Sequence, residues 1–292
     1  MTRDFRTLPA DEHSAATLAS QGLTYAIVGD AAEQQDAFSQ AISRGFYGTQ
    51  LTDERLGEER PRLGETRSVG VYDDSGAEPS IPVATVDSWA SPLTMPGGGA
   101  LESWAISAVT VAPTHRRRGI ARALLEGELR TARDGGIPIA VLTVSESTIY
   151  GRYGFGPATW AAELIVDTKR AGWAGPTPAG RLHLVSRESA RESAPAIEER
   201  ARTHGSIARW GGHWNRQLGL RPSDASSAAG IRVVRYDDES GAAQGVAIYK
   251  VKDAGPDFTK HPVEIIELIA ATDDAYAALW RYLLELDLVS EV

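Results

Sequence analysis

The 292-residue chain contains no cysteine, which excludes a disulfide framework, a cysteine-ligated zinc site and a cysteine acyl-enzyme. No apolar run is long enough to span a bilayer, and residues 1–5 lack the hydrophobic centre of a signal peptide. The rest of the composition, 42% hydrophobic and 24% charged, is that of a globular protein. We therefore expect a cytoplasmic protein with no membrane partner.

The chain also has fewer positive than negative residues: 30 Lys and Arg residues against 39 Asp and Glu residues give a net charge of −9. Such an acidic chain disfavours general binding to nucleic acid and favours a cationic small-molecule substrate. The length exceeds that of one average domain, so two domains are expected.

Against this acidic background, one basic run stands out. Arg116, Arg117 and Arg118 lie between an apolar β-branched stretch, 108–112, and an Ala- and Leu-rich stretch that starts at Ile120. This order predicts a strand, a loop and a helix, and the first N–H groups of a helix attract anions. Gly119 lets a ligand approach the backbone closely. The sequence has neither G-x-x-x-x-G-K-[ST] nor G-x-G-x-x-G, so a P-loop and a dinucleotide fold are disfavoured.

Arg116-x-x-Gly119-x-Ala121 resembles the [QR]-x-x-G-x-[GA] signature of the GNAT N-acetyltransferase superfamily, whose loop holds the pyrophosphate of acetyl-coenzyme A. Read alone, the arginines are equally typical of a solvated helix start. A second motif follows in Ser145-Glu146 and in Ile149-Tyr150-Gly151-Arg152-Tyr153-Gly154-Phe155-Gly156. Both motifs together are similar to the enhanced intracellular survival (Eis) branch of the superfamily, which acetylates aminoglycosides and other amines.

Hydropathy patterns predict an α/β (α+β) fold with two domains of similar order, and the resemblance implies that both are GNAT-like. Residues 1–170 form the catalytic domain, 171–180 a Gly- and Pro-rich linker, and 181–292 a degenerate second copy. Each domain is expected to hold a mixed, mostly antiparallel sheet with a parallel β-α-β core and flanking helices. The first half predicts strands over 25–28, 67–72, 81–89, 103–111 and 137–144, the last buried on both faces, and helices over 33–46 (capped by Asp30), 52–62 and 117–133.

The second half repeats this order, with strands over 181–185, 231–236, 245–251 and 263–270 and helices over 189–204, 209–218 and 273–285. Where the first half has its arginines, the second has Ala271-Thr272-Asp273-Asp274. Carboxylates there would repel a pyrophosphate, so the second domain is not expected to bind coenzyme A. The Eis family continues into a sterol-carrier-like domain and forms hexamers. Relative to it this chain looks truncated, and a homo-oligomer is the expected assembly.

The resemblance implies a site for acetyl-CoA as cosubstrate, without a metal. Tyr150 would protonate the departing thiolate, although a partly buried tyrosine that merely finds a partner is the alternative. Ser145 and Glu146 would contact the cofactor or only cap a helix. The backbone around Val111 would bind the pantetheine arm and the thioester oxygen. The loop of Arg116, Arg117 and Arg118, called the arginine loop below, would bind the diphosphate. These cofactor-binding residues are Val109, Thr110, Val111, Arg116, Arg117, Arg118, Gly119, Ile120, Ala121 and Arg122.

The general base is not identified by the sequence. Ala105 and Ser107 stand where many GNAT enzymes carry a carboxylate, Glu102 lies at the start of the strand, and the Eis family uses a terminal carboxylate. Phe46, Tyr47 and Trp104 would either line an amine pocket or belong to the core, and His115 is expected to be a solvated loop residue. The predicted function is acetyl transfer from acetyl-CoA to an aminoglycoside-like compound, a polyamine or lysine. A non-catalytic coenzyme A-binding scaffold or sensor, and less so a nucleic-acid binder, are the alternatives.

Overall fold

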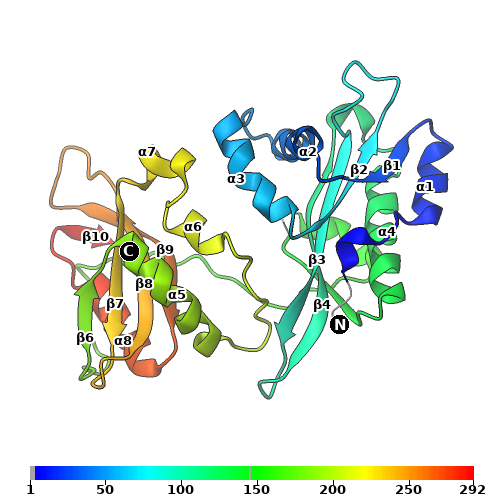
Figure 1. Cartoon of the computed structure of the whole chain (residues 1–292). Helices are drawn as coiled ribbons and strands as arrows, with labels where there is room; N and C mark the ends of the chain where they lie inside the picture. The colour runs from blue at the N-terminus through cyan, green and yellow to red at the C-terminus, as the bar shows by residue number, and fades with distance from the viewer. Residues whose placement is uncertain (1–3, 145) are drawn as a thin grey trace. The chain divides into compact units, whose positions relative to one another are not determined.

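The computed structural model describes residues 4–144 and 146–292, which form two compact units (Figure 1). The first unit holds the described residues up to Thr159 together with His204–Ala208. The second unit holds Trp160–Thr203 and Arg209–Val292, so residues 160–180 cluster with the second unit.

The first unit is a five-stranded sheet with helices on it. Its strands follow the chain in the order β1-β2-β3-β4-β5, antiparallel except for the parallel pair β4–β5. Its elements are η1 (Phe5–Thr7), α1 (Glu12–Ala19), β1 (Thr24–Ile27), α2 (Ala32–Gly45), α3 (Asp53–Leu63), β2 (Arg67–Tyr72), β3 (Ala84–Thr94), β4 (Ala100–Val111), η2 (Pro113–His115), α4 (Ile120–Asp134), β5 (Ile139–Leu142), η3 (Ser147–Ile149) and η4 (Gly151–Tyr153).

Most of the predicted elements of the first unit are present, and the differences have local causes. The predicted strand over 137–144 is shorter and lies at the sheet edge, where the Ile139 side chain is 37% exposed, so the expectation of burial on both faces was wrong. Asp30 does not cap α2, which starts after Ala31 without a side-chain cap. Helix α1 was not predicted, because its short, Ala-rich sequence has a weak apolar pattern.

The second unit repeats the order of the first. Its elements are β6 (Arg181–Leu184), α5 (Arg187–Ala201), α6 (His213–Gln217), η5 (Pro222–Asp224), α7 (Ala225–Ala228), β7 (Ile231–Asp237), β8 (Ala243–Val251), β9 (His261–Ala270), α8 (Asp273–Leu284) and β10 (Val289–Glu291). The sheet order is β10-β9-β8-β7-β6, with β9 and β10 parallel. The predicted duplication and the fold class are confirmed, whereas the helix expected over 209–218 is reduced to five residues.

A β-bulge in β4 shapes the first sheet. Thr85 of β3 faces Thr110, but Asp87 faces Ser107, so β4 gains one residue between these pairs. Ala108 takes a φ of +52° there, and the Thr85 hydroxyl donates to its carbonyl oxygen over 2.7 Å. Pairing of β4 with β5 ends at Ile106 and Leu142. The end of β4 therefore continues beyond its pairing with β5.

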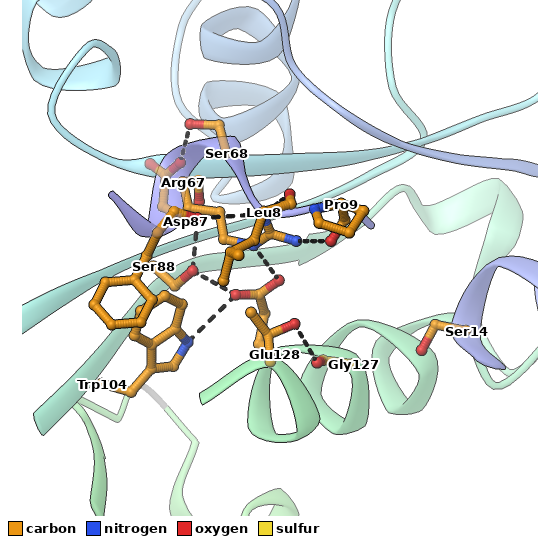
Figure 2. A network of polar contacts seen from close by, with 12 residues as sticks. Leu8, Pro9, Ser14, Arg67, Ser68, Asp87, Ser88, Trp104, Gly127 and Glu128 are labelled. Carbon is orange, nitrogen blue, oxygen red and sulfur yellow. Dashed lines mark hydrogen bonds and ion pairs between the residues drawn. The ribbon is translucent and has the colours of Figure 1, made fainter. Parts of the chain in front are cut away.

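A buried ion pair joins the helix α4 to the sheet (Figure 2). Arg67 of β2 and Glu128 of α4 are fully buried, with Arg67 Nε 3.4 Å from Glu128 Oε1. Ser88 and the Trp104 indole donate to the other carboxylate oxygen, and Arg67 also donates to the carbonyls of Leu8 and Pro9. Burial raises the pKa of Glu128, while the Arg67 charge opposes that rise. The network fixes one face of α4, the helix that begins at the arginine loop.

Candidate active site

The end of β4, the start of α4 and the turns after β5 surround one pocket of about 730 Å³. The C-terminus of α2 completes its wall. Its lining residues are Gly45, Phe46, Tyr47, Val109, Thr110, Val111, His115, Arg116, Arg117, Gly119, Ile120, Ala121, Arg122, Glu146, Ile149, Tyr150, Arg152 and Tyr153. The structure thus brings together residues from both sequence motifs, which are separated by more than twenty positions.

The arginine loop is not helical, contrary to the prediction that the helix starts at Arg117. Helix α4 begins at Ile120, because Arg117 and Gly119 both take left-handed conformations, with φ of +63° and +77°. Gly119 is the N-cap and offers no side chain to the first N–H groups of the helix. These groups and the positive end of the helix dipole are therefore available to an anion at the pocket wall.

The arginine side chains of this loop do not all line the pocket. Arg116, Arg117 and Arg122 line the pocket, and Arg152 adds a fourth positive charge from the turns after β5. Arg118 is not part of the lining, and its side chain donates to the carbonyl of Gln21 over 3.2 Å. The pocket therefore concentrates positive charge within an acidic chain, as an anionic ligand requires.

Tyr150 lies in the same pocket and is largely buried, with 9% of its surface exposed. Its ring packs edge-on against Phe155, with the centroids 6.1 Å apart. Burial raises the pKa of the Tyr150 phenol, and the nearby Glu146 carboxylate adds to the rise. The phenol is thus protonated at neutral pH and can donate a proton.

Comparison with known proteins identifies the family of the chain. Two family models, each described as an acetyltransferase (GNAT) domain, match residues 31–158 and 205–292. The chain belongs to the GNAT acetyltransferase family. It holds two GNAT domains in tandem, as the sequence predicted, and it is Eis-like.

Three relatives illustrate the similarity. An uncharacterised N-acetyltransferase of Streptomyces avermitilis is 34% identical over 262 residues, which cover 86% of this chain and 61% of that protein. N-acetyltransferase Eis of Mycobacterium tuberculosis is 37% identical over 210 residues, which cover 68% and 49%. The crystal structure of Eis1 from Mycobacterium abscessus superposes with a TM-score of 0.73 at 30% identity and covers 92% and 64%. The chain spans between 49% and 64% of the length of these relatives.

The other residues that the sequence singled out in the first GNAT domain lie in different environments. Glu146 lines the pocket and precedes η3 without a side-chain cap, whereas Ser145 lies outside the described residues. Trp104 is fully buried and belongs to the core, so it does not line an amine pocket. Phe46 and Tyr47 are exposed and line the pocket wall, so they are not core residues.

His115 is not the solvated residue that the sequence predicted. Its Nε2 lies 3.0 Å from Asp73 Oδ2, and its side chain is mostly buried. A hydrogen bond from the Ser75 hydroxyl, followed by the one from His115, lowers the pKa of Asp73 to about 2. This contact ties the start of the arginine loop to the turn after β2.

Sequence reasoning missed the bulge at Ala108, because alanine seldom adopts a positive φ and carries no local signal for one. It also gave no general base, and the structure adds none at the expected place. Ala105 is buried, and Ser107 and Glu102 are exposed on β4 outside the pocket lining. Among the described residues, no three His, Asp or Glu side chains are grouped to hold a metal, and no helix is long and apolar enough to cross a membrane.

Proposed function

We propose that the first GNAT domain transfers an acetyl group from acetyl-CoA to the primary amine of a small cationic acceptor, such as an aminoglycoside, a polyamine or lysine. The observation that carries this proposal is that one pocket holds the uncapped start of α4, four arginines and the protonated Tyr150. Acetyl-CoA supplies the acetyl thioester when bound. The acidic chain favours a cationic acceptor.

Different residues of the pocket would bind different parts of acetyl-CoA. The N–H groups at Ile120, Ala121 and Arg122, with the arginine side chains, would bind the diphosphate. The backbone of Val109 and Val111, beyond the pairing of β4 with β5, would hold the pantetheine arm and donate to the thioester oxygen as negative charge develops there. Holding amine and thioester in contact supplies much of the rate.

Tyr150 would act as the general acid. As the amine nitrogen bonds to the carbonyl carbon, the C–S bond breaks and the thiolate takes the phenolic proton. The attacking amine releases one proton to solvent, and the Tyr150 phenolate regains one from solvent, so the net products are the acetylated amine and the free thiol of coenzyme A. Because burial raises the pKa of Tyr150, we expect kcat to hold on the alkaline side until the pH passes the ordinary tyrosine value of about 10. A pH–rate profile measures this.

Tyr150→Phe tests the proposal. The variant should lower kcat about 100-fold, which is within the range for a general acid, and leave acetyl-CoA affinity nearly unchanged. Tyr72→Phe is the matched control, because Tyr72 is a largely buried tyrosine of the same domain outside the pocket lining. Transfer is followed by thiol release over a panel of aminoglycosides, polyamines and lysine peptides. Unchanged turnover in Tyr150→Phe would remove the acid assignment.

The alternative is a coenzyme A-binding scaffold or sensor without catalysis. Acetyl-CoA binding by calorimetry, combined with no transfer to any amine in the panel, would favour it. Absence of acetyl-CoA binding would contradict both functions.

A further inference from the structure

A tyrosine occupies a backbone position that normally belongs to glycine, at the rim of the pocket. Helix α2 ends in a Schellman motif, in which Tyr47 N–H donates to the Arg44 carbonyl over 3.1 Å and Gly48 N–H donates to the Ser43 carbonyl over 2.8 Å. Tyr47 is the residue that takes the left-handed conformation, with a φ of +58°. A non-glycine residue is strained in this conformation, because its Cβ crowds the backbone.

Packing does not explain the choice of tyrosine. The Tyr47 side chain is 77% exposed, so its ring buries little apolar surface. The start of this turn is nevertheless fixed in place, because Gly45 lies so close to Thr110 of β4 that a Cβ at Gly45 would clash with the threonine side chain. The backbone that carries the exposed ring is therefore held against β4 beside the pocket.

The partner of Tyr47 is Arg116, the first residue of the arginine loop. Arg116 Nη2 donates to the Tyr47 hydroxyl over 3.2 Å, and the guanidinium carbon lies 5.9 Å from the centre of the Tyr47 ring. Arg116 Nε also points at the Val111 carbonyl, at 3.4 Å. These two contacts use only part of the five N–H groups of the guanidinium. The remaining donors can bind an anion.

We propose that Tyr47 is a positioning residue that holds the Arg116 guanidinium ready for the phosphate groups of the acyl carrier. An arginine side chain loses conformational entropy when it is fixed. Tyr47 restricts this freedom before the ligand arrives, so the strained turn gains ligand affinity. The inference rests on the proposed function, since it needs acetyl-CoA to bind in this pocket.

The test begins with three variants of Tyr47, measured by calorimetry with acetyl-CoA. Tyr47→Ala and Tyr47→Gly both delete the ring, and each should raise the Kd about 3- to 10-fold, whereas Tyr47→Phe, which keeps the ring, should raise it only about 2-fold. Only Tyr47→Gly also relieves the backbone strain, so it should unfold at a higher temperature than Tyr47→Ala. An equal affinity loss in a more stable and a less stable variant would place the effect in the ring, not in a damaged turn.

The decisive measurement is the double variant. If Tyr47 acts through Arg116, then Tyr47→Gly should change the Kd less than 2-fold in an Arg116→Ala background. The same loss in both backgrounds, or no loss in the wild-type background, would overturn the proposal. If the wild-type chain does not bind acetyl-CoA, the proposed function itself fails, which is a different outcome.

Discussion

The two GNAT domains share one order of strands and helices but differ where the helix after the fourth strand begins. Helix α4 starts after Gly119, an N-cap residue without a capping side chain, and arginines precede it. Helix α8 starts after Thr272, whose hydroxyl accepts from Ala275 N–H over 3.2 Å, and Asp273 and Asp274 occupy its first turn. One helix start is open and positive, while the other is capped and negative. The same fold therefore has an uncapped helix start beside arginines in one domain and a capped start with two carboxylates in the other.

The contacts between helix and sheet differ as well. In the first sheet the buried Arg67 pairs with Ser88, whereas in the second sheet the buried Tyr249 pairs with Arg232, which is exposed. In the first domain the helix supplies Glu128 to Ser88 and Arg67. In the second, α8 supplies Tyr282, whose hydroxyl bonds that of Tyr249 over 2.7 Å. The first domain thus joins helix and sheet through a buried charge pair, and the second through a neutral, partly buried pair. Breaking the two pairs should therefore lower the free energy of unfolding by different amounts.

We expect the largest effect when the start of α4 is given the negative charge that the start of α8 carries. Arg116→Asp combined with Arg117→Asp should weaken acetyl-CoA binding by at least 100-fold, because about 3–6 kcal/mol of charge-assisted hydrogen bonding is lost and like charges repel. Arg133→Asp at the far, exposed end of α4 is the control and should keep the affinity within about 3-fold. Equal losses in both, measured by calorimetry, would contradict a local diphosphate site.

The next largest effect is expected on stability, from breaking the Arg67–Glu128 pair and the Tyr249–Tyr282 pair. Glu128→Gln keeps the shape but leaves Arg67 buried without a counter-charge, and should lower the free energy of unfolding by about 3–5 kcal/mol. Tyr282→Phe in the second domain removes one neutral hydrogen bond and should cost about 1 kcal/mol. Denaturant titrations measure both. Similar costs for the two variants would show that the charge pair has no special weight.

Helix α1 is a further difference between the domains, since no helix precedes β6 in the described part of the second domain. Removing a contact of α1 should have a smaller effect. Burial would raise the pKa of Asp11, but Arg130 and Ser14 outweigh it and lower the pKa to about 2. Because this folded-state pKa lies below the ordinary value of 3.8, the ionised form stabilises the fold above pH 4. Asp11→Asn should therefore cost about 2 kcal/mol at pH 7.

The same linkage fixes the pH dependence of that cost. The difference in unfolding free energy between Asp11→Asn and the wild type should shrink as the pH falls from about 4 to about 2. Thermal unfolding of both proteins over this range measures it. A difference that stays constant down to pH 2 would show that packing around α1, not the carboxylate charge, stabilises this contact.

Much of the fold could be predicted from local pattern alone. The apolar periodicity of 67–72, the alternation in the strands of the second half and the Ala- and Leu-rich helix before Glu285 each depend on a few neighbouring residues, and the structure confirms them. Edges were harder to predict. The apolar run 137–144 gives no indication of how many strands flank it, and only the assembled sheet makes β5 an edge. Helix α1 is stabilised by its contacts with α4, which lie more than a hundred residues away.

The sequence by itself determined the family, the duplication and the contrast between Arg116–Arg118 and Asp273–Asp274, because these follow from residue identity and order. Tertiary structure alone decided that Arg118 turns away to Gln21, that Ala108 adopts a positive φ, and that Tyr47 meets Arg116. The physical reason is that each of these features depends on a partner distant in the chain. A backbone angle or a side-chain direction that is unfavourable locally persists only when such a partner holds it in place.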